Sequence, residues 1–137
     1  MNLIALDIGD SRIGIAFGDS KTKISTPICV CTSDDVLKKS KNFSCILDDY
    51  QPEKFIVGLP KSLDGSQNAQ AEHVKEIAGK IKNLYNIEIE YVDERLSSKE
   101  AKSLLKEQGL SEKQMRGKID SVAASLFLET YLASSKL

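Results

Sequence analysis

Hydrophobic and polar positions divide the first part of the chain into three strands. Residues 2–8 are almost wholly apolar, as in a strand that is covered on both faces of a sheet. The turn-forming residues 9–12 follow, and residues 13–18 return as a second strand. A third strand is expected at 24–31, and because Pro27 cannot donate a hydrogen bond to a neighbouring strand, we expect it at a sheet edge.

Helical and strand-like patterns alternate in the rest of the chain. We expect a helix from Thr32 or Ser33 to about Tyr50, and then a buried strand at 54–60. A second helix follows, with an apolar stripe from Ala71 to Leu84, and leads to a half-buried strand at 87–94. A third helix is expected from the capping box of Ser97 and Glu100 to Gly109, and a last helix at about 119–133. Strands joined through helices lie parallel, with right-handed connections. The pattern predicts an α/β fold: a mixed five-stranded sheet whose first three strands are antiparallel and whose later strands are parallel, with helices on its faces.

Length and composition indicate an ordinary globular protein. The 137 residues predict one domain, spanning positions 1–137, that is large enough to bury a real core. Of these residues, 41% are hydrophobic and 28% are charged, and the net charge is −1. The overall charge therefore does not itself indicate a nucleic acid or a membrane as partner.

Cysteine usage and hydropathy predict the compartment. Cys29, Cys31 and Cys45 do not form an even disulfide framework, so we interpret them as small apolar packing residues in a reducing environment. No basic leader precedes an apolar stretch, and no apolar run approaches the roughly 20 residues that span a bilayer. We therefore expect a cytoplasmic protein that has no membrane partner.

Basic residues gather between positions 95 and 118. This segment contains seven basic and three acidic residues, a local charge of +4. A run of charge is often the solvated face of a helix. It is also the kind of surface that binds nucleic-acid phosphates with strong salt dependence. The sequence leaves both interpretations open.

Acidic residues stand at three places where the predicted elements begin or end. Asp7 lies inside an apolar strand, where an ionised carboxylate without a partner costs several kcal/mol. Asp93 and Glu94 close the strand at 87–94, and Asp120 opens the last helix. Taken singly, Asp7 could cap the following turn, Asp93 or Glu94 could be a surface residue, and Asp120 could complement the helix dipole.

Taken together, these acids predict a metal site. In open α/β sheets, sites form at the carboxyl ends of the strands. Two carboxylates about 4 Å apart repel each other by roughly 4 kcal/mol at an effective dielectric of 20. Either a shared proton or divalent ions can relieve this repulsion. A set of oxygen ligands favours Mg²⁺ or Mn²⁺, and a pair of such ions catalyses phosphodiester cleavage.

Four ordered blocks carry a resemblance to a known family. They are LDIGDSRIGIAFGD (6–19), VGLPKSLDGSQNAQA (57–71), VDERLSS (92–98) and IDSVAASLFLETYL (119–132). The chain resembles the YqgF-type Holliday junction resolvases, a family also described as pre-16S rRNA nucleases. The resemblance implies a ribonuclease H-like fold and a metal-dependent nuclease. It also implies that Asp7, Glu94 and Asp120 are the catalytic, metal-binding residues.

The same resemblance implies the substrate and the partners. It implies processing of the 5′ end of precursor 16S rRNA, on ribosomal pre-particles, with four-way DNA junctions as the alternative substrate. One departure concerns the fourth strand, which ends VGLP without the acid that related resolvases carry there. The second acid must then come from the fifth strand. Alternation along that strand does not distinguish Asp93 from Glu94, and Glu94 is chosen on family grounds.

Three arginines are candidates for contacts to nucleic acid. Arg12 could reach a phosphate beside Asp7, or could pair with Asp10 or Asp19. Arg95 could hold the scissile phosphate or balance the acids beside it, and Arg116 belongs to the basic segment.

Two functions of other classes compete with the nuclease. An early Asp-x-Gly also occurs in nucleotide-binding modules, which use two such domains around ATP. A non-catalytic nucleic-acid- or ribosome-binding protein could use the same scaffold. The sequence does not choose between RNA and DNA, and it leaves the oligomeric state open.

Overall fold

Five strands form a mixed sheet in the order β3-β2-β1-β4-β5. The computed structural model describes residues 1–60, 69–93, 103–111 and 118–134. The strands are β1 (Asn2–Ile8), β2 (Arg12–Asp19), β3 (Ile24–Thr32), β4 (Lys54–Leu59) and β5 (Glu88–Asp93). β2 pairs antiparallel with both β1 and β3, whereas the β1–β4 and β4–β5 pairs are parallel. The predicted mixed sheet is confirmed, with β1 at its centre and the Pro27-containing strand at an edge.

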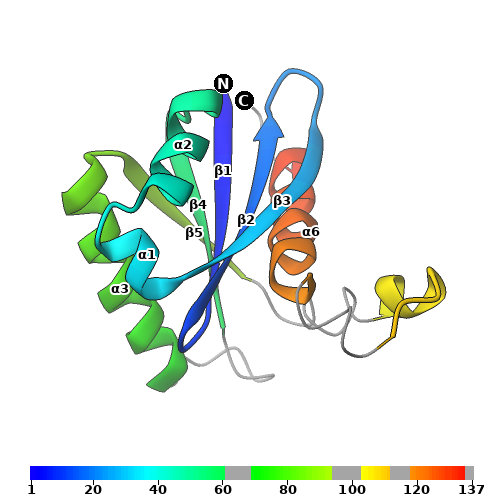
Figure 1. Cartoon of the computed structure of the whole chain (residues 1–137). Helices are drawn as coiled ribbons and strands as arrows, with labels where there is room; N and C mark the ends of the chain where they lie inside the picture. The colour runs from blue at the N-terminus through cyan, green and yellow to red at the C-terminus, as the bar shows by residue number, and fades with distance from the viewer. Residues whose placement is uncertain (61–68, 94–102, 112–117, 135–137) are drawn as a thin grey trace.

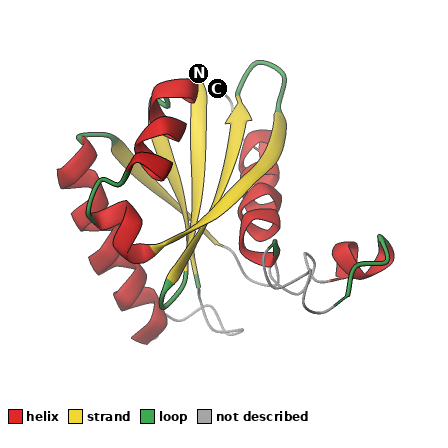
Figure 2. Ribbon diagram, in the orientation of Figure 1, coloured by secondary structure: helices red, strands yellow, loops and turns green. Residues whose placement is uncertain are grey.

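Helices cover both faces of this sheet (Figures 1 and 2). The helices on one face, called here the α3 face, are α1 (Ser33–Leu37), α2 (Lys41–Tyr50) and α3 (Ala69–Tyr85). The opposite face, called the α6 face, is covered by α6 (Ile119–Ser134). Residues 103–107 form one further short turn of helix, after which Gly109 takes a positive φ of 79°. That glycine ends the helix as predicted, whereas the capping box of Ser97 and Glu100 lies outside the described residues.

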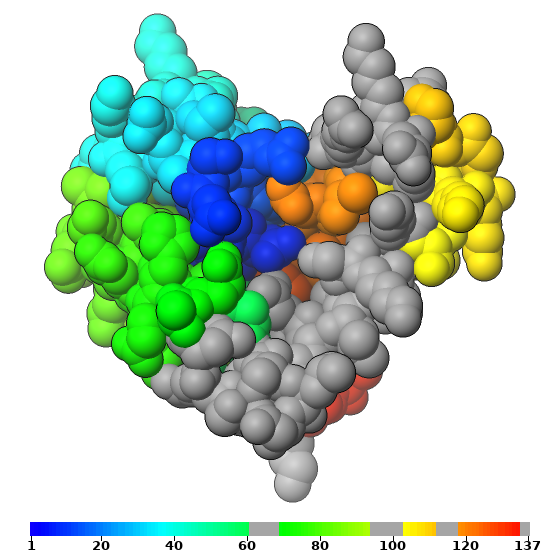
Figure 3. All heavy atoms as spheres, turned by 90° about the horizontal axis from the view of Figure 1, so that it is seen from below, coloured from blue at the N-terminus to red at the C-terminus, as the bar shows by residue number. Residues whose placement is uncertain are grey.

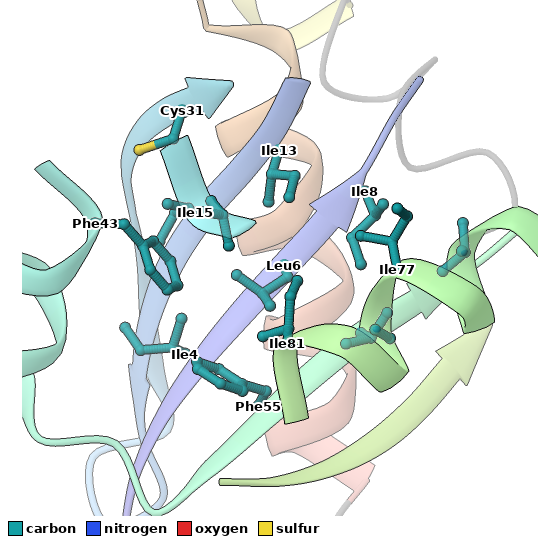
Figure 4. Packing of buried hydrophobic residues seen from close by; sticks show 14 of the residues in the cluster. Ile4, Leu6, Ile8, Ile13, Ile15, Cys31, Phe43, Phe55, Ile77 and Ile81 are labelled. Atoms are coloured by element: carbon teal, nitrogen blue, oxygen red, sulfur yellow. The ribbon is translucent and has the colours of Figure 1, made fainter. Parts of the chain in front are cut away.

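The side chains of β1 alternate between two buried cores. Ile4, Leu6 and Ile8 pack on the α3 face against α2, α3 and β4, as Figure 4 shows. Leu3 and Ala5 pack on the α6 face. Burial on both faces explains why this strand reads as a continuous apolar run in the sequence.

Small residues on β2 allow α6 to approach the sheet closely. Ala16 is fully buried under the helix, and a Cβ atom added to Gly18 would lie 2.7 Å from the Cδ2 atom of Leu128. β3 also contacts this helix, because the Ser25 hydroxyl donates a 2.7 Å hydrogen bond to the carbonyl oxygen of Ser125. α6 therefore packs closely on the hairpin formed by β2 and β3.

The single helix expected after the third strand is wrong, because the structure has two helices there. Thr32 caps the first one, as predicted, and its hydroxyl accepts a 3.1 Å hydrogen bond from a backbone N–H in the first turn. Lys39 then takes a left-handed φ of 56°, and α2 begins after Ser40. Val36 and Phe43, on either side of the break, enter the same core. The apolar pattern therefore continues across the break and does not reveal it.

The cysteines differ in their burial. Cys31 is buried on the α3 face, Cys29 is half-buried with its Sγ atom 4.0 Å from that of Cys31, and all three cysteines are free. Burial, with the neighbouring Cys29 thiol, raises the pKa of Cys31 to about 12, so this thiol stays protonated. The packing role predicted for Cys45 is wrong, because its side chain is exposed on α2.

None of the helices among the described residues combines the length and the apolar character that crossing a membrane requires.

Candidate active site

The parallel strands β1, β4 and β5 end at the same edge of the sheet. The β1–β2 turn and the first residues of α6 lie at this end of the molecule (Figure 1). Figure 3 views the molecule from this end, and the blue N-terminal segment there contacts the orange start of α6. This is the edge at which open α/β sheets form their sites.

Asp7 stands at the end of a buried row on β1. Its side chain follows those of Leu3 and Ala5 in the alternation, so it lies on the α6 face. Only 7% of the residue is exposed. The carboxylate in the apolar strand is therefore the last member of the row that faces α6.

Gly14 connects Asp7 to Asp120. It is the residue of β2 that pairs with Asp7, and such strand partners have Cα atoms about 4.5–5.5 Å apart. A Cβ atom at Gly14 would lie only 2.1 Å from the backbone oxygen of Asp120. The first turn of α6 thus lies directly against the residue opposite Asp7, which brings two of the three predicted acids to one place.

The sequence reasoning missed Gly14. The available signal is a glycine in the interior of a strand, which often marks a close approach of another backbone. The pattern does not identify the backbone that approaches, because Asp120 is distant from Gly14 along the chain.

Asp120 is half-buried beside one arginine. Burial raises the pKa of its carboxyl group, while the Arg12 guanidinium acts in the opposite direction. The Nε atom of Arg12 lies 3.7 Å from the Oδ2 atom of Asp120, with side-chain exposures of 54% and 25%. Asp10 and Asp19 are the partners that the sequence suggests for Arg12, but the ion pair in the structure is with Asp120.

We expect Asp120→Asn to be more stable than the wild type at neutral pH. Because the pKa is raised from its usual 3.8, the folded protein binds this proton more tightly than the unfolded chain does. The free energy of unfolding therefore falls as the pH rises from the unfolded pKa through the folded pKa, and the cost is fully present above both. Thermal unfolding of both proteins without divalent ions should show a gap that closes in acid. A wild type as stable as the variant at neutral pH would contradict this expectation.

Asp93 lies on the opposite face of the sheet from Asp7. It pairs in register with Leu59, whose side chain belongs to the core on the α3 face. Paired residues of neighbouring strands point to the same face, so Asp93 cannot join Asp7 on the α6 face without a change of the strand. Its neighbour Glu94 lies outside the described residues, as do Arg95 and Arg116.

The two described acids fit a hard divalent cation. Asp7 and Asp120 offer carboxylate oxygens, the ligands that Mg²⁺ and Mn²⁺ prefer. Gly14 leaves room where a side chain would collide with the Asp120 backbone. Within the described ranges, no group of three or more Asp, Glu, His or Cys residues could hold a metal ion. The third predicted ligand, Glu94, lies outside those ranges.

A cavity of about 410 Å³ opens beside the start of α6. It lies between this helix and β3, and its walls include Val30, Lys118, Ser121 and Val122. Lys118 is the last residue of the basic segment noted in the sequence, and its side chain is exposed. Lys118 therefore puts a positive charge at the wall of this cavity, two residues before Asp120 in the chain.

Comparison with protein families and curated relatives gives a consistent result. The model of a family described as RuvX, Holliday junction resolvase, matches residues 1–134. A protein of Fusobacterium nucleatum is 43% identical over 137 residues, covering 97% of each chain. Proteins of Escherichia coli O157:H7 and Methylobacillus flagellatus are 35% and 32% identical, and each match covers 94% of this chain. All three carry the name "Putative pre-16S rRNA nuclease".

Solved structures share the fold at low sequence identity. Fowlpox virus resolvase in complex with Holliday junction DNA superposes with a TM-score of 0.56 at 18% identity, over 98% of both chains. RuvC of T. thermophilus in complex with a Holliday junction gives a TM-score of 0.51 at 13% identity, over 98% of this chain and 94% of that one. These likenesses confirm the predicted ribonuclease H-like fold.

Proposed function

Because this chain belongs to the RuvX family of Holliday junction resolvases, we propose that it is a metal-dependent nuclease that processes the 5′ end of precursor 16S rRNA. The observation that carries the proposal is the meeting of Asp7 and Asp120 at Gly14, at the carboxyl edge of the sheet. Bacterial relatives that are named for pre-16S rRNA support this substrate and a cytoplasmic location. Ribosomal precursor particles are the partners that such a substrate implies.

In this proposal Asp7, Glu94 and Asp120 are the catalytic residues and the ligands of Mg²⁺ or Mn²⁺. The position of Asp93 on the α3 face argues against Asp93 as the third acid, and Glu94 is the residue that the family resemblance implies. Bound divalent ions would activate a water molecule and stabilise the departing oxygen of the phosphodiester. Asp7 and Asp120 would hold them from β1 and α6, two elements that are packed into one core.

Basic residues around the acids would bind the substrate backbone. Arg12, Arg95 and Arg116 are the proposed contacts, since the planar fork of an arginine matches a phosphate. Arg12 supports this assignment among the described residues, because its Nε atom lies 3.7 Å from the Oδ2 atom of Asp120. The proposal takes residues 1–137 as one nuclease domain.

A second candidate substrate is a four-way DNA junction. The description of the matching family and the two resolvases that share the fold favour it. Contacts to the 2′-hydroxyl group would distinguish RNA from DNA. The same assay can therefore present both substrates to the protein.

The test is a cleavage assay on a 5′ precursor fragment of 16S rRNA and on a four-way junction, with Mg²⁺, Mn²⁺ or EDTA. We expect metal-dependent cleavage of the RNA, lost in Glu94→Gln. Asp93→Asn is the matched control, because Asp93 is the adjacent acid and lies on the α3 face, away from Asp7. This variant should leave cleavage unchanged. Cleavage of the junction alone would favour the second substrate. Binding of both substrates without cleavage under any metal would contradict the nuclease and favour a non-catalytic binding protein.

A further inference from the structure

Arg12 is the cation that the described structure holds against Asp120. It is the first residue of β2 and lies on the α6 face, two positions before Gly14. Its Nε atom is 3.7 Å from the Oδ2 atom of Asp120, and more than half of the arginine side chain is exposed. The guanidinium group is therefore tethered at one end of the site and open to solvent.

This ion pair is poorly suited to a structural role. The contact runs through a single nitrogen beyond hydrogen-bond distance, and exposed pairs of this kind contribute little to folding. Its effect is instead local, because it places a positive charge beside the carboxylate of Asp120, which the proposed function assigns to a divalent ion. Two cations beside the same carboxylate repel each other, so each lowers the affinity of the carboxylate for the other.

We propose that Arg12 exchanges partners during the catalytic cycle: it neutralises Asp120 in the metal-free protein and turns to the substrate phosphate when a divalent ion takes Asp120. The inference rests on the proposed function, and it adds an order of events, in which metal binding frees the arginine for the nucleic acid. The exposed side chain has room to turn. Its planar fork can then bind a phosphate through two parallel hydrogen bonds.

The exchange predicts opposite effects on the two ligands. Without the positive charge at position 12, Mn²⁺ has no competing cation at the Asp120 carboxylate. Arg12→Gln should therefore bind Mn²⁺ about threefold to tenfold more tightly. The same variant should bind nucleic acid about tenfold more weakly at saturating Mn²⁺, because one charge-assisted contact is lost. A residue that merely maintained the fold would weaken both.

The experiment measures Mn²⁺ affinity by calorimetry without nucleic acid. It also measures the affinity at saturating Mn²⁺ for a fluorescent precursor RNA made resistant to cleavage by phosphorothioate linkages. Arg12→Lys keeps the charge and should bind Mn²⁺ as the wild type does. Lys21→Gln removes a charge from the exposed β2–β3 turn at the far end of β2 and should change neither affinity more than about twofold. Circular dichroism checks that each variant is folded.

The outcomes separate this inference from the proposed function. If Arg12→Gln leaves Mn²⁺ affinity unchanged or weakens it, Arg12 does not compete for Asp120 and the exchange is wrong. If its RNA affinity is also unchanged, the phosphate contact is wrong as well. If Asp120→Asn binds Mn²⁺ as tightly as the wild type, the metal site itself is wrong, and the proposed function fails for a reason independent of Arg12.

Discussion

Asp7→Asn is expected to abolish cleavage and to leave the protein folded. The substitution keeps the shape of the side chain but removes the charge that a divalent ion would bind, and a lost metal contact of this kind costs on the order of 10³-fold in rate. Asp7 is almost fully buried at the end of the row that faces α6. The core should tolerate the change, because asparagine fills nearly the same space and its side-chain oxygen still accepts hydrogen bonds.

The measurement is the initial rate of precursor cleavage with saturating Mg²⁺ or Mn²⁺, together with the melting temperature. Asp10→Asn is the matched control, since it makes the same change three residues later on the exposed turn. We expect Asp10→Asn to cleave at the wild-type rate. Wild-type cleavage by Asp7→Asn would remove the central residue of the proposed site, and a variant that is unfolded would show that Asp7 is needed for structure.

Gly14→Ala is expected to damage both stability and activity. The new Cβ atom would lie 2.1 Å from the backbone oxygen of Asp120 and 2.2 Å from its carbonyl carbon. These are backbone atoms of a packed helix, so α6 must move away from β2. Overpacking of this kind typically costs about 1–3 kcal/mol of folding free energy. Because the movement separates Asp120 from Asp7, we also expect cleavage to fall by at least about tenfold.

Gly79→Ala is the matched control for this change. Gly79 lies within α3, and a Cβ atom added there meets no other atom within 4 Å. Alanine at that position should stabilise the helix by up to about 1 kcal/mol. Urea unfolding should therefore show a lower free energy of unfolding for Gly14→Ala and a higher one for Gly79→Ala. Cleavage assays should show a loss of activity only for Gly14→Ala. Equal stability of Gly14→Ala and the wild type would contradict the close seating of α6 on β2.

The strands, and the edge position of the third one, could be predicted from the sequence because they follow from local patterns. Burial on both faces makes β1 continuously apolar, and the proline in β3 marks an edge. The break at Lys39 could not be predicted, since the apolar positions on its two sides face one core. A single left-handed residue does not change the periodicity of such positions.

The candidate site could be predicted only in part. The rule that parallel strands end at one edge predicted a site near Asp7 and Glu94, and the position of Asp120 in the first turn of a helix allowed it to approach that site from the face of the sheet. The contact between Gly14 and Asp120 joins residues from distant parts of the chain, so no local pattern contains it. The face of Asp93 likewise depends on its register with β4, which alternation within one strand does not fix. The partner of Arg12 was missed for the same reason.

The seating of α6 on β2 has a consequence for how this protein can change. The helix that carries Asp120 also supplies Phe127, Leu128 and Leu132 to the core on its face of the sheet. One helix thus carries both a proposed catalytic residue and part of the core, so a change that loosens its packing is expected to disturb both. A substitution that shifts α6 to adjust the chemistry at Asp120 would therefore also disturb the hydrophobic interior on that face of the sheet.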